Sequence, residues 1–349
     1  MKCIRINSLL LAVITLTLIG VIGTSTATTV MARSTQHATQ TVDFDGDGKT
    51  DVALFDNTLA RWFIYDFYKG TLSQYHFGSS DHRQVVGDYD GDGMSDFATC
   101  YDNFKTGVTM WRISYSTYGP KGDISWGRPG DIPVPADYDG DGLTDVAVFR
   151  PAGGVWYIRL SASKSMRVEQ FGYASDKLVP ADYDGDGLVD VAVMRPEANE
   201  WHIHFSSDDS IQTIGWDVKP MTGDVMVPSD YDGDGRADLA VYRNNGGLWI
   251  ILESLSGNYR FAQFGNGIYS GDPTQADVSE NNLDLPMPGD FDGDGIADIA
   301  VWNVKSKIVN VLPSASSMMS SVPVGTESSI PISLSVVSQY LQLNTIAFR

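Results

Sequence analysis

Residues 134–151 read Val-Pro-Ala-Asp-Tyr-Asp-Gly-Asp-Gly-Leu-Thr-Asp-Val-Ala-Val-Phe-Arg-Pro, an acidic, glycine-rich loop followed by a β-branched apolar segment. The loop phrase, Asp-(Phe/Tyr)-Asp-Gly-Asp-Gly-x-x-Asp-apolar-Ala, occurs six times, and its copies begin at Asp43, Asp88, Asp137, Asp182, Asp230 and Asp290. Successive copies start 45, 49, 45, 48 and 60 residues apart. A period of this size indicates a solenoid, propeller or array built from one repeated supersecondary unit.

Each copy places carboxylates at positions 1, 3, 5 and 9 of the loop and glycines at positions 4 and 6. Calcium takes about six to eight oxygen ligands, and alternating Asp side chains on a tight turn can direct several oxygens at one point. Glycine permits backbone conformations that a Cβ would forbid, so the chain can wrap around an ion. Position 7 carries unrelated side chains, as expected if only its backbone carbonyl binds the metal.

These features predict a calcium site in every loop, with about six Ca²⁺ as the only cofactor. A metal-free acidic turn would be a fair alternative for one copy, but six intact copies, holding 24 of the 44 acidic residues, favour calcium. Magnesium prefers a smaller octahedron and keeps its waters. The predicted ligands are Asp43, Asp45, Asp47, Lys49, Asp51, Asp88, Asp90, Asp92, Met94, Asp96, Asp137, Asp139, Asp141, Leu143, Asp145, Asp182, Asp184, Asp186, Leu188, Asp190, Asp230, Asp232, Asp234, Arg236, Asp238, Asp290, Asp292, Asp294, Ile296 and Asp298.

The loops differ from an EF-hand, which begins in the same way but needs a bidentate Glu at position 12 and a helix on each side. The segment after each loop is β-branched and aromatic, which favours a strand. The loops are therefore predicted to join two strands. Position 12 carries no carboxylate in any copy, and reads Leu54, Thr99, Val148, Val193, Val241 and Val301.

One repeat predicts four short antiparallel strands, at residues 132–136, 145–150, 155–160 and 167–171. Four strands per unit of about 45 residues is typical of a propeller blade. We therefore predict an all-β fold, a β-propeller of four-stranded blades over residues 33–325. Six blades are favoured. Residues 326–349 echo two strands without an acidic loop, and are predicted to be closing strands or a partial, degenerate seventh blade.

The N-terminal segment predicts a secretory signal peptide over residues 1–32, because basic residues precede a short apolar run and small residues follow it. A retained membrane anchor is the alternative. We expect a secreted or cell-surface protein without a membrane span after cleavage, or else a periplasmic one. The net charge of −20 argues against nucleic acid as a partner.

The combination of Phe-Gly, a strand and the Asp-x-Asp-Gly-Asp-Gly-x-x-Asp loop resembles the FG-GAP repeats of the integrin α-chain propeller. It is still more similar to the FG-GAP/VCBS-type repeats of secreted bacterial proteins, over about residues 38–325. The resemblance implies a β-propeller with calcium in the loop between the first two strands of each blade. The Gly-Ala-Pro element is absent from this chain, which loosens the integrin comparison. The resemblance names no ligand.

Several side chains outside the loops invite a functional reading, and for each we favour a structural one. The recurring Trp residues of the third strand could stack on sugars, but they are expected to pack between blades: Trp62, Trp111, Trp156, Trp201 and Trp249. Cys100, the single cysteine after the signal segment, is expected to be a small buried apolar group. Arg150, Arg195 and Arg243 could line an anion-binding surface or bridge blades to the acidic loops, and we favour the bridges.

We predict no catalytic residues. His202 and His204 share a strand face and could hold a second metal or act as a base, but two outward polar side chains are the favoured interpretation. No Gly-x-Ser-x-Gly elbow occurs in the sequence. The predicted function is a non-enzymatic, calcium-stabilised recognition or adhesion scaffold for an extracellular protein or glycan. A lectin-like carbohydrate-binding module is the alternative, followed by a polysaccharide lyase or hydrolase.

The longest departure from the repeat is the insertion at residues 267–285, before the sixth loop. Loops that interrupt a repeat often carry function. Tyr269, Asp272 and Asp277 are therefore candidates for a partner site, with a spacer as the alternative. The sequence leaves the oligomeric state open.

Overall fold

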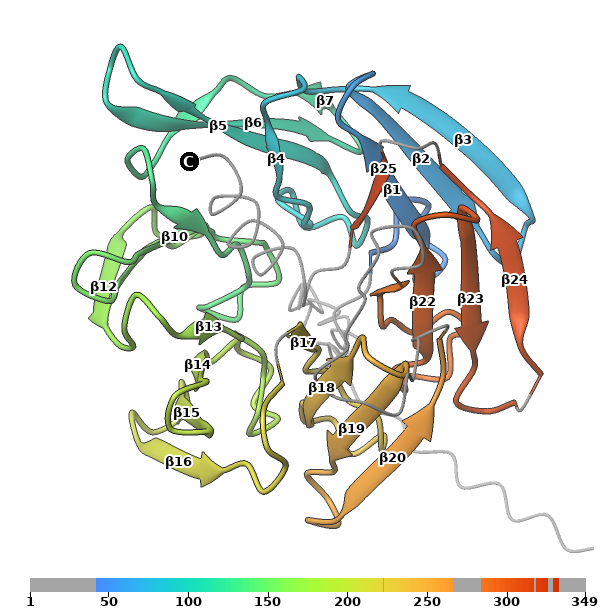
Figure 1. Cartoon of the computed structure of the whole chain (residues 1–349). Coiled ribbons are helices and arrows are strands. Elements are labelled where there is room, and N and C mark those ends of the chain that lie inside the picture. Colours follow the sequence, from blue (N-terminus) through green and yellow to red (C-terminus); the bar gives the residue numbers. More distant parts are fainter. Residues whose placement is uncertain (1–41, 222, 266–283, 317, 326–328, 333–349) are drawn as a thin grey trace, which may run out of the picture. The chain divides into compact units, whose positions relative to one another are not determined.

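The computed structural model describes residues 42–221, 223–265, 284–316, 318–325 and 329–332. Regular structure within these ranges consists of β-strands, without a helix. The strands form six antiparallel sheets that follow one another in sequence order around a common centre (Figure 1). The predicted all-β propeller with six blades is confirmed.

Each blade begins with a short inner strand, continues through two longer strands and ends on an outer strand. Blade 2 differs in that two short pieces, β7 and β8, share the outer position beside β6. The strands of blades 1 to 3 are, in spatial order, β25 (Ser329–Ile332), β1 (Val52–Asp56), β2 (Arg61–Asp66) and β3 (Thr71–His76); β4 (Arg83–Gln84), β5 (Phe97–Asn103), β6 (Val108–Tyr115), β7 (Gly119–Pro120) and β8 (Ile124–Ser125); β9 (Ile132–Pro133), β10 (Val146–Arg150), β11 (Val155–Arg159) and β12 (Met166–Gln170).

Blades 4 to 6 repeat this plan with strands of nearly constant length. In blades 2 to 6 the acidic loop connects the first strand to the second, as the sequence predicts. The strands of blades 4 to 6 are β13 (Lys177–Leu178), β14 (Val191–Arg195), β15 (Glu200–His204) and β16 (Ile211–Gly215); β17 (Asp224–Met226), β18 (Leu239–Arg243), β19 (Leu248–Leu252) and β20 (Tyr259–Gln263); β21 (Asp284–Pro286), β22 (Ile299–Asn303), β23 (Ile308–Leu312) and β24 (Ser320–Pro323).

Blade 1 is completed from both ends of the described chain. Its inner strand is β25, which pairs antiparallel with β1 and places Ile330 opposite Phe55. Blade 3 has the same register, with Ile132 opposite Phe149. The described part of the C-terminal tail therefore forms an inner strand of the first blade, and no seventh sheet occurs among the described residues.

The predicted signal peptide at residues 1–32 and the tail at 333–349 lie outside the described residues. Where the chain is described, no helix has the length and apolar character needed to cross a membrane.

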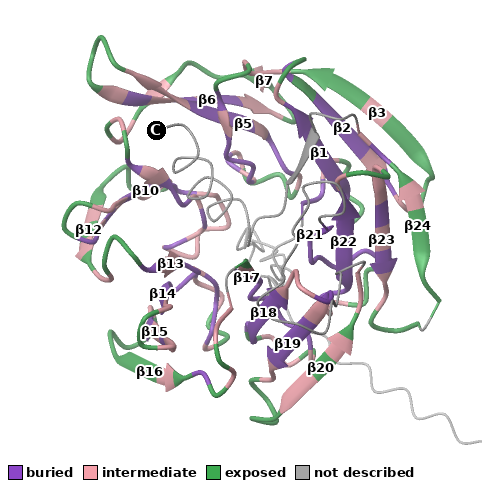
Figure 2. Ribbon diagram, viewed as in Figure 1, coloured by how far each residue is buried: buried purple, intermediate pink, exposed green. Residues whose placement is uncertain are grey.

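The hydrophobic core lies between neighbouring blades. The second strand of a blade is buried on both faces, as in β10, whereas the third strand alternates and the outer strand is largely exposed (Figure 2). One cluster joins Tyr183 and Trp201 of blade 4 to Leu239 and Ile250 of blade 5. This gradient explains the sequence pattern, because strands covered on both faces need continuous apolar residues and half-covered strands need alternation.

The recurring Trp residues are fully buried, so the interpretation as core is confirmed. Four of them also fasten the blade, because the indole N–H donates to the last carbonyl before the glycine that ends the outer strand. In blade 3 this bond joins Trp156 to Phe171 at 2.9 Å. The other three bonds join Trp62 to Phe77, Trp111 to Trp126 and Trp249 to Phe264.

Blade 6 keeps this fastening with the aromatic residue moved to the neighbouring strand. Val309 stands where the other blades have Trp, and the residue paired with it on β22 is Trp302. The Trp302 indole donates to the Val324 carbonyl at 3.2 Å. Either paired strand can therefore supply the indole, and the bond is present in five of the six blades; in blade 4 the buried Trp201 N–H makes no such bond.

Cys100 is fully buried, as predicted, and burial raises the pKa of its thiol to about 11. The three recurring Arg residues have the structural role that we favoured, but their partners differ from those expected. Each pairs with an Asp at the start of the inner strand of its own blade, and not with an acidic loop or another blade. The pairs are Arg150–Asp131, Arg195–Asp176 and Arg243–Asp224.

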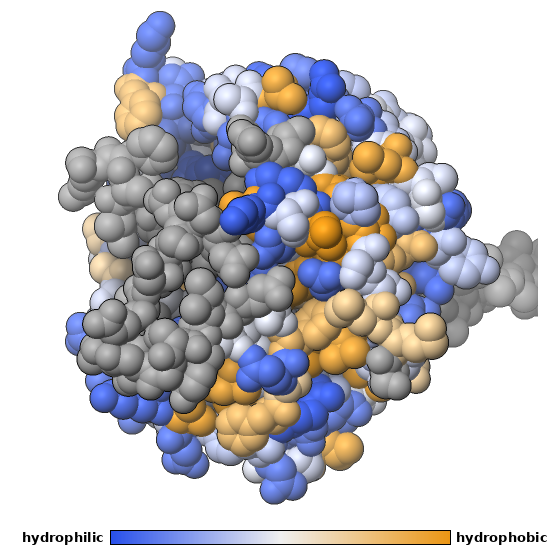
Figure 3. Space-filling view, turned by 45° about the vertical axis from the view of Figure 1, so that its right-hand side comes forward, coloured by the Kyte–Doolittle hydropathy of each residue, from blue (hydrophilic) through white to orange (hydrophobic). Residues whose placement is uncertain are grey.

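Large hydrophobic side chains that remain exposed are distributed over several turns, for example at Tyr68, Phe104 and Tyr118. Figure 3 shows hydrophobic and hydrophilic residues interleaved on one face of the molecule. Scattered exposure of this kind is normal for a folded protein. The outer strands are better candidates for a binding surface, because their exposed residues can vary without disturbing the core.

Trp156→Ala is expected to lower the free energy of unfolding by about 3–5 kcal/mol, because it removes a fully buried indole and its hydrogen bond. Phe104→Ala, which truncates an exposed aromatic, is the matched control and should change it by less than about 0.5 kcal/mol. Urea unfolding of both variants in calcium checks this. Equal stabilities would contradict the assignment of Trp156 to the core.

Candidate metal centre

The first carboxylate of each loop shapes the turn. In the third loop, Asp137 accepts the backbone N–H of Gly140 through Oδ1 at 2.7 Å and that of Gly142 through Oδ2 at 2.8 Å. Both glycines have positive φ, of 72° and 83°, which a side chain would disfavour. All six loops make the same pair of bonds. The conserved spacing of Asp and Gly within this chain therefore has a local structural cause.

The carboxylate at position 9 joins the loop to the rest of the blade. Asp145 accepts the N–H of Tyr138 through Oδ2 at 2.9 Å and the N–H of Ser161 through Oδ1 at 2.6 Å. Ser161 follows β11, so this one side chain connects the start of the loop to the end of the third strand. The Oδ2 bond recurs in every loop, and the Oδ1 bond to a Ser recurs in blades 2, 4, 5 and 6.

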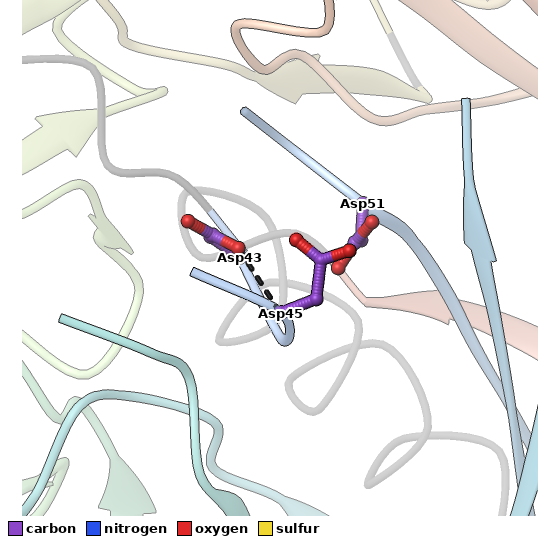
Figure 4. Close-up of side chains that lie close together, drawn as sticks. All are labelled: Asp43, Asp45 and Asp51. Carbon is purple, nitrogen blue, oxygen red and sulfur yellow. Dashed lines mark hydrogen bonds between the residues drawn. The ribbon is translucent and has the colours of Figure 1, made fainter. Parts of the chain in front are cut away.

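Positions 1, 3 and 9 bring their carboxylates together. In the first loop, one oxygen from each of Asp43, Asp45 and Asp51 lies within 4.8 Å of the others, and the three side chains point toward a common space (Figure 4). The same spacing recurs in further loops, in the groups Asp88, Asp90, Asp96; Asp137, Asp139, Asp145; and Asp182, Asp184, Asp190. Three hard oxygen donors at this separation are suited to one divalent cation.

Position 5 makes a different set of contacts in the same loops. Asp141 accepts the N–H of Leu143 through Oδ1 at 2.8 Å and the hydroxyl of Ser161 through Oδ2 at 2.5 Å. The Oδ1 bond recurs in all six loops, and blades 2, 4 and 6 repeat the Ser bond. Its place as a calcium ligand, like that of the position-7 carbonyl, remains a prediction.

Burial makes the position-9 carboxyls hard to ionise without a cation. Removal from water raises their pKa and nearby loop carboxylates raise it further, while the hydrogen bonds from backbone N–H groups act in the opposite direction. The pKa is raised to about 7 at Asp51, Asp145, Asp190, Asp238 and Asp298, and to about 6 at Asp96. A bound divalent cation would favour the charged form and release these protons.

Some loop oxygens are buried without a hydrogen bond of good geometry. They are both carboxylate oxygens of Asp90 and Oδ1 of Asp139, all at position 3. Burial and a neighbouring carboxylate raise the pKa of both groups. Unsatisfied buried acceptors are uncommon in folded proteins. Acceptors that face two further carboxylates fit a calcium ion, so the donor set agrees with the metal that the sequence predicts.

The six loops are also bonded to one another in a closed ring. The backbone N–H at position 8 of each loop donates to the carbonyl at position 1 of the preceding loop, over 2.5–2.9 Å. Thr50 of the first loop donates to Asp290 of the last, which closes the circle. The remaining bonds run from Ser95 to Asp43, Thr144 to Asp88, Val189 to Asp137, Ala237 to Asp182 and Ala297 to Asp230.

Side chains at position 7 reinforce this ring. Each lies against the position-4 glycine of the preceding loop; Ile296, for example, approaches to 3.0 Å from the place where a Cβ of Gly233 would be. The variability at position 7 therefore reflects a contact that many side chains can make. Equivalent approaches join Met94 to Gly46, Leu143 to Gly91, Leu188 to Gly140, Arg236 to Gly185 and Lys49 to Gly293.

Sequence reasoning missed two sets of residues that support the loops. The first is the Asp that pairs with the recurring Arg, which stands six residues before the loop at Asp131, Asp176 and Asp224. Asp284 has the same place in blade 6, where it accepts a hydrogen bond from Asn303. The second is the Ser that follows the third strand, sixteen residues after position 9, at Ser161, Ser206, Ser254 and Ser314. Both recur at constant spacing, which is the signal that could have identified them.

His202 and His204 lie on one face of β15, as predicted, and both are engaged by neighbours. Arg195 donates to Nε2 of His202 at 3.0 Å, and Thr213 lies 3.0 Å from its Nδ1. His204 lies between Glu169 of the preceding blade and Asp209. These contacts agree with two polar side chains on an outward face. Tyr269, Asp272 and Asp277 lie outside the described residues.

Comparison with known proteins supports the repeat and the fold. A family model described as the FG-GAP-like repeat matches residues 230–301, which span the fifth and sixth loops. The resemblance to FG-GAP repeats is therefore confirmed for this segment. No curated protein sequence matches the chain significantly.

Solved structures with similar backbones include TolB from Acinetobacter baumannii, with a TM-score of 0.50, 10% identity and coverage of 81% of this chain and 65% of that one. A virginiamycin B lyase from Staphylococcus aureus has a TM-score of 0.46 at 10% identity, covering 83% and 89%. AztD from Citrobacter koseri has a TM-score of 0.41 at 11% identity, covering 80% and 98%. At such identities the TolB likeness supports the fold alone.

The distinct contacts of positions 3 and 9 predict distinct effects of substitution. Without calcium and at pH 5, where the pKa of about 7 keeps most of Asp145 protonated in the folded state, Asp145→Ala should lower the free energy of unfolding by about 2–3 kcal/mol, because the N–H groups of Tyr138 and Ser161 lose their acceptor. Asp139→Ala should change it by less than about 0.5 kcal/mol, because its buried Oδ1 accepts no well-formed hydrogen bond.

Urea unfolding in EDTA measures both stabilities, and calorimetric titration measures the calcium bound by each variant. Each substitution should remove one site. Equal stability losses in EDTA would contradict the structural role of position 9, and unchanged stoichiometry would contradict the ligand assignment.

Proposed function

We propose that this chain is an exported, calcium-stabilised β-propeller that acts as a non-enzymatic recognition scaffold. The observation that supports it most is the convergence of three loop carboxylates, at positions 1, 3 and 9, repeated around a closed ring. Carboxylates crowded in this way repel one another, and a divalent cation would convert the repulsion into a cross-link. The proposed ligand set is the one that the sequence predicts, with about six Ca²⁺.

Calcium would act here as a structural ion. The loops are tied to the blade through position 9 and to the next loop through positions 1 and 8. An ion held in each loop would therefore stabilise the ring as a whole. Cys100 is the single cysteine after the proposed signal segment, so bound calcium would take the part that disulfides have in many exported proteins.

The remaining surfaces are available for recognition. Outer strands such as β3, β12 and β16 are largely exposed and share few residue types from blade to blade. A scaffold of constant core with variable outer strands suits the binding of an extracellular protein or glycan. We favour this over a polysaccharide lyase or hydrolase, because the 24 loop carboxylates, more than half of the 44 acidic residues, are assigned to calcium and are poor candidates for acid–base catalysis.

Calcium should raise the melting temperature by at least about 10 °C relative to EDTA, through occupancy of several sites that the unfolded chain lacks. The difference should grow between pH 5 and pH 8. Position-9 carboxyls have a pKa raised to about 7 in five loops, against about 4 when unfolded, so the ion-free fold loses stability as pH rises through this range.

Scanning calorimetry at both pH values, with calcium, magnesium or EDTA, checks this prediction. Magnesium should stabilise less than calcium. A melting temperature that is the same in calcium and EDTA at pH 8 would contradict the proposed role of the ion.

A further inference from the structure

A pocket of about 260 Å³ lies between blades 1 and 2, beside the first loop. Three of its lining residues, Thr71, Ser73 and Tyr75, alternate along β3 and therefore share one face of that strand. Phe97, at the start of β5, lines it from blade 2. The volume lies slightly below the range of about 300–1,000 Å³ usual for small-molecule sites, which suits a ligand of one ring.

Aromatic side chains line part of this pocket. Tyr75 is 48% exposed, and its ring lies 4.9 Å from that of Phe97. Phe97 in turn stacks on Phe44 at 4.7 Å. The cluster therefore holds Tyr75 in place while leaving much of its ring open to solvent. An open aromatic ring supported from behind can receive the apolar face of a ligand ring.

Polar groups also line the pocket, two of them on the same face of β3 as Tyr75. The hydroxyls of Thr71 and Ser73 make no hydrogen bond within the described part of the chain, whereas Asp66 is almost fully buried. Lys69 pairs with both Asp66 and Asp45, so one cation faces two of the lining carboxylates. Asp51, the third, belongs to the first calcium loop. With calcium bound in that loop, as proposed above, Lys69 and the ion would together offset the three lining carboxylates. The pocket would then offer hydrogen-bonding groups without a strong demand for another positive charge.

These pocket residues break the repeat. At the place of Phe97 the other blades have Val52, Val146, Val191, Leu239 and Ile299. Tyr75 is paired with Trp62 of the third strand. The residues paired with the corresponding Trp, or with Val309 in blade 6, are Ile124, Glu169, Ile214, Ala262 and Val322. Among the described strands, an aromatic pair at these two positions therefore occurs between blades 1 and 2 alone, and the core of the other blades does not require it.

We propose that this pocket binds a neutral monosaccharide unit of a glycan, stacked on Tyr75 and hydrogen-bonded by Thr71, Ser73 and Asp66. An apolar ring face combined with several hydroxyls is the chemistry that this arrangement complements. The inference rests on the proposed recognition function and specifies its partner. Since Asp45 and Asp51 line both the pocket and the first loop, binding should weaken when calcium is removed.

The test titrates methyl glycosides of glucose, galactose, mannose, fucose and N-acetylglucosamine into the protein in calcium, followed by saturation-transfer NMR and calorimetry. At least one glycoside should bind, with a millimolar Kd. Tyr75→Ala should weaken that binding about tenfold, through loss of the stacking surface. Phe261→Ala is the matched control, because Phe261 is 58% exposed on the outer strand β20, and it should leave binding unchanged.

Thr71→Val provides a second variant that alters an exposed position without removing an aromatic contact, and it should also weaken binding. The proposal is overturned if no glycoside binds the folded protein, or if both pocket variants bind as the unsubstituted protein does. Binding of tetramethylammonium in place of the glycosides would overturn it in favour of a cation pocket. The melting temperature is measured on the same samples in calcium and in EDTA. It tests the proposed role of calcium independently of glycoside binding.

Discussion

The structure depends on the closed ring of backbone hydrogen bonds that joins the six acidic loops. Each loop donates from position 8 to the carbonyl of position 1 in the loop before it, and Thr50 closes the ring on Asp290. A second closure comes from β25, which pairs with β1 to complete the first blade. Blades that each make mostly nearest-neighbour contacts need such closures, because an open array would leave two unpaired faces.

The hydrogen bonds that fix each loop also hold its carboxylates close together, so that they repel one another. Position 9 must be buried, because it links the loop to the third strand, and position 1 must shape the turn. The loop therefore cannot move its acidic groups apart without losing the contacts that hold the blade. On the proposed account, calcium resolves this conflict and makes the ring rigid. The outer strands are then free to vary, and the pocket between blades 1 and 2 is one result of that freedom.

Much of the fold could be predicted from the sequence, because each blade repeats the same pattern of an acidic loop followed by an apolar strand. The loop phrase fixes the turn through Asp and Gly, and the apolar run after it can only be a doubly covered strand. The place of residues 329–332 could not be decided, since their likeness to residues 132–134 fits an inner strand of either a first or a seventh blade. The ring of hydrogen bonds between loops could not be predicted from the sequence, because its bonds join backbone groups and need no particular side chain.

The candidate site, like the fold, has features that the sequence predicts and features that it does not. The acidic residues were identifiable, since their spacing is constant, but the different contacts of positions 3, 5 and 9 depend on strands that the sequence does not order in space. The Asp partners of the recurring Arg residues stand at a constant spacing, but a single Asp before a short strand has no motif that marks it as the partner of an Arg 19 residues later. The meeting of Phe97 with Tyr75 was beyond prediction, as it arises across a blade boundary.

Anomalous X-ray scattering from crystals grown in calcium tests the central claim most directly, because it locates the ions themselves. The account predicts an anomalous peak in each of the six loops, about 2.3–2.6 Å from carboxylate oxygens of positions 1, 3 and 9. Loops that show the described fold without an anomalous peak, in crystals grown at millimolar calcium, would contradict it.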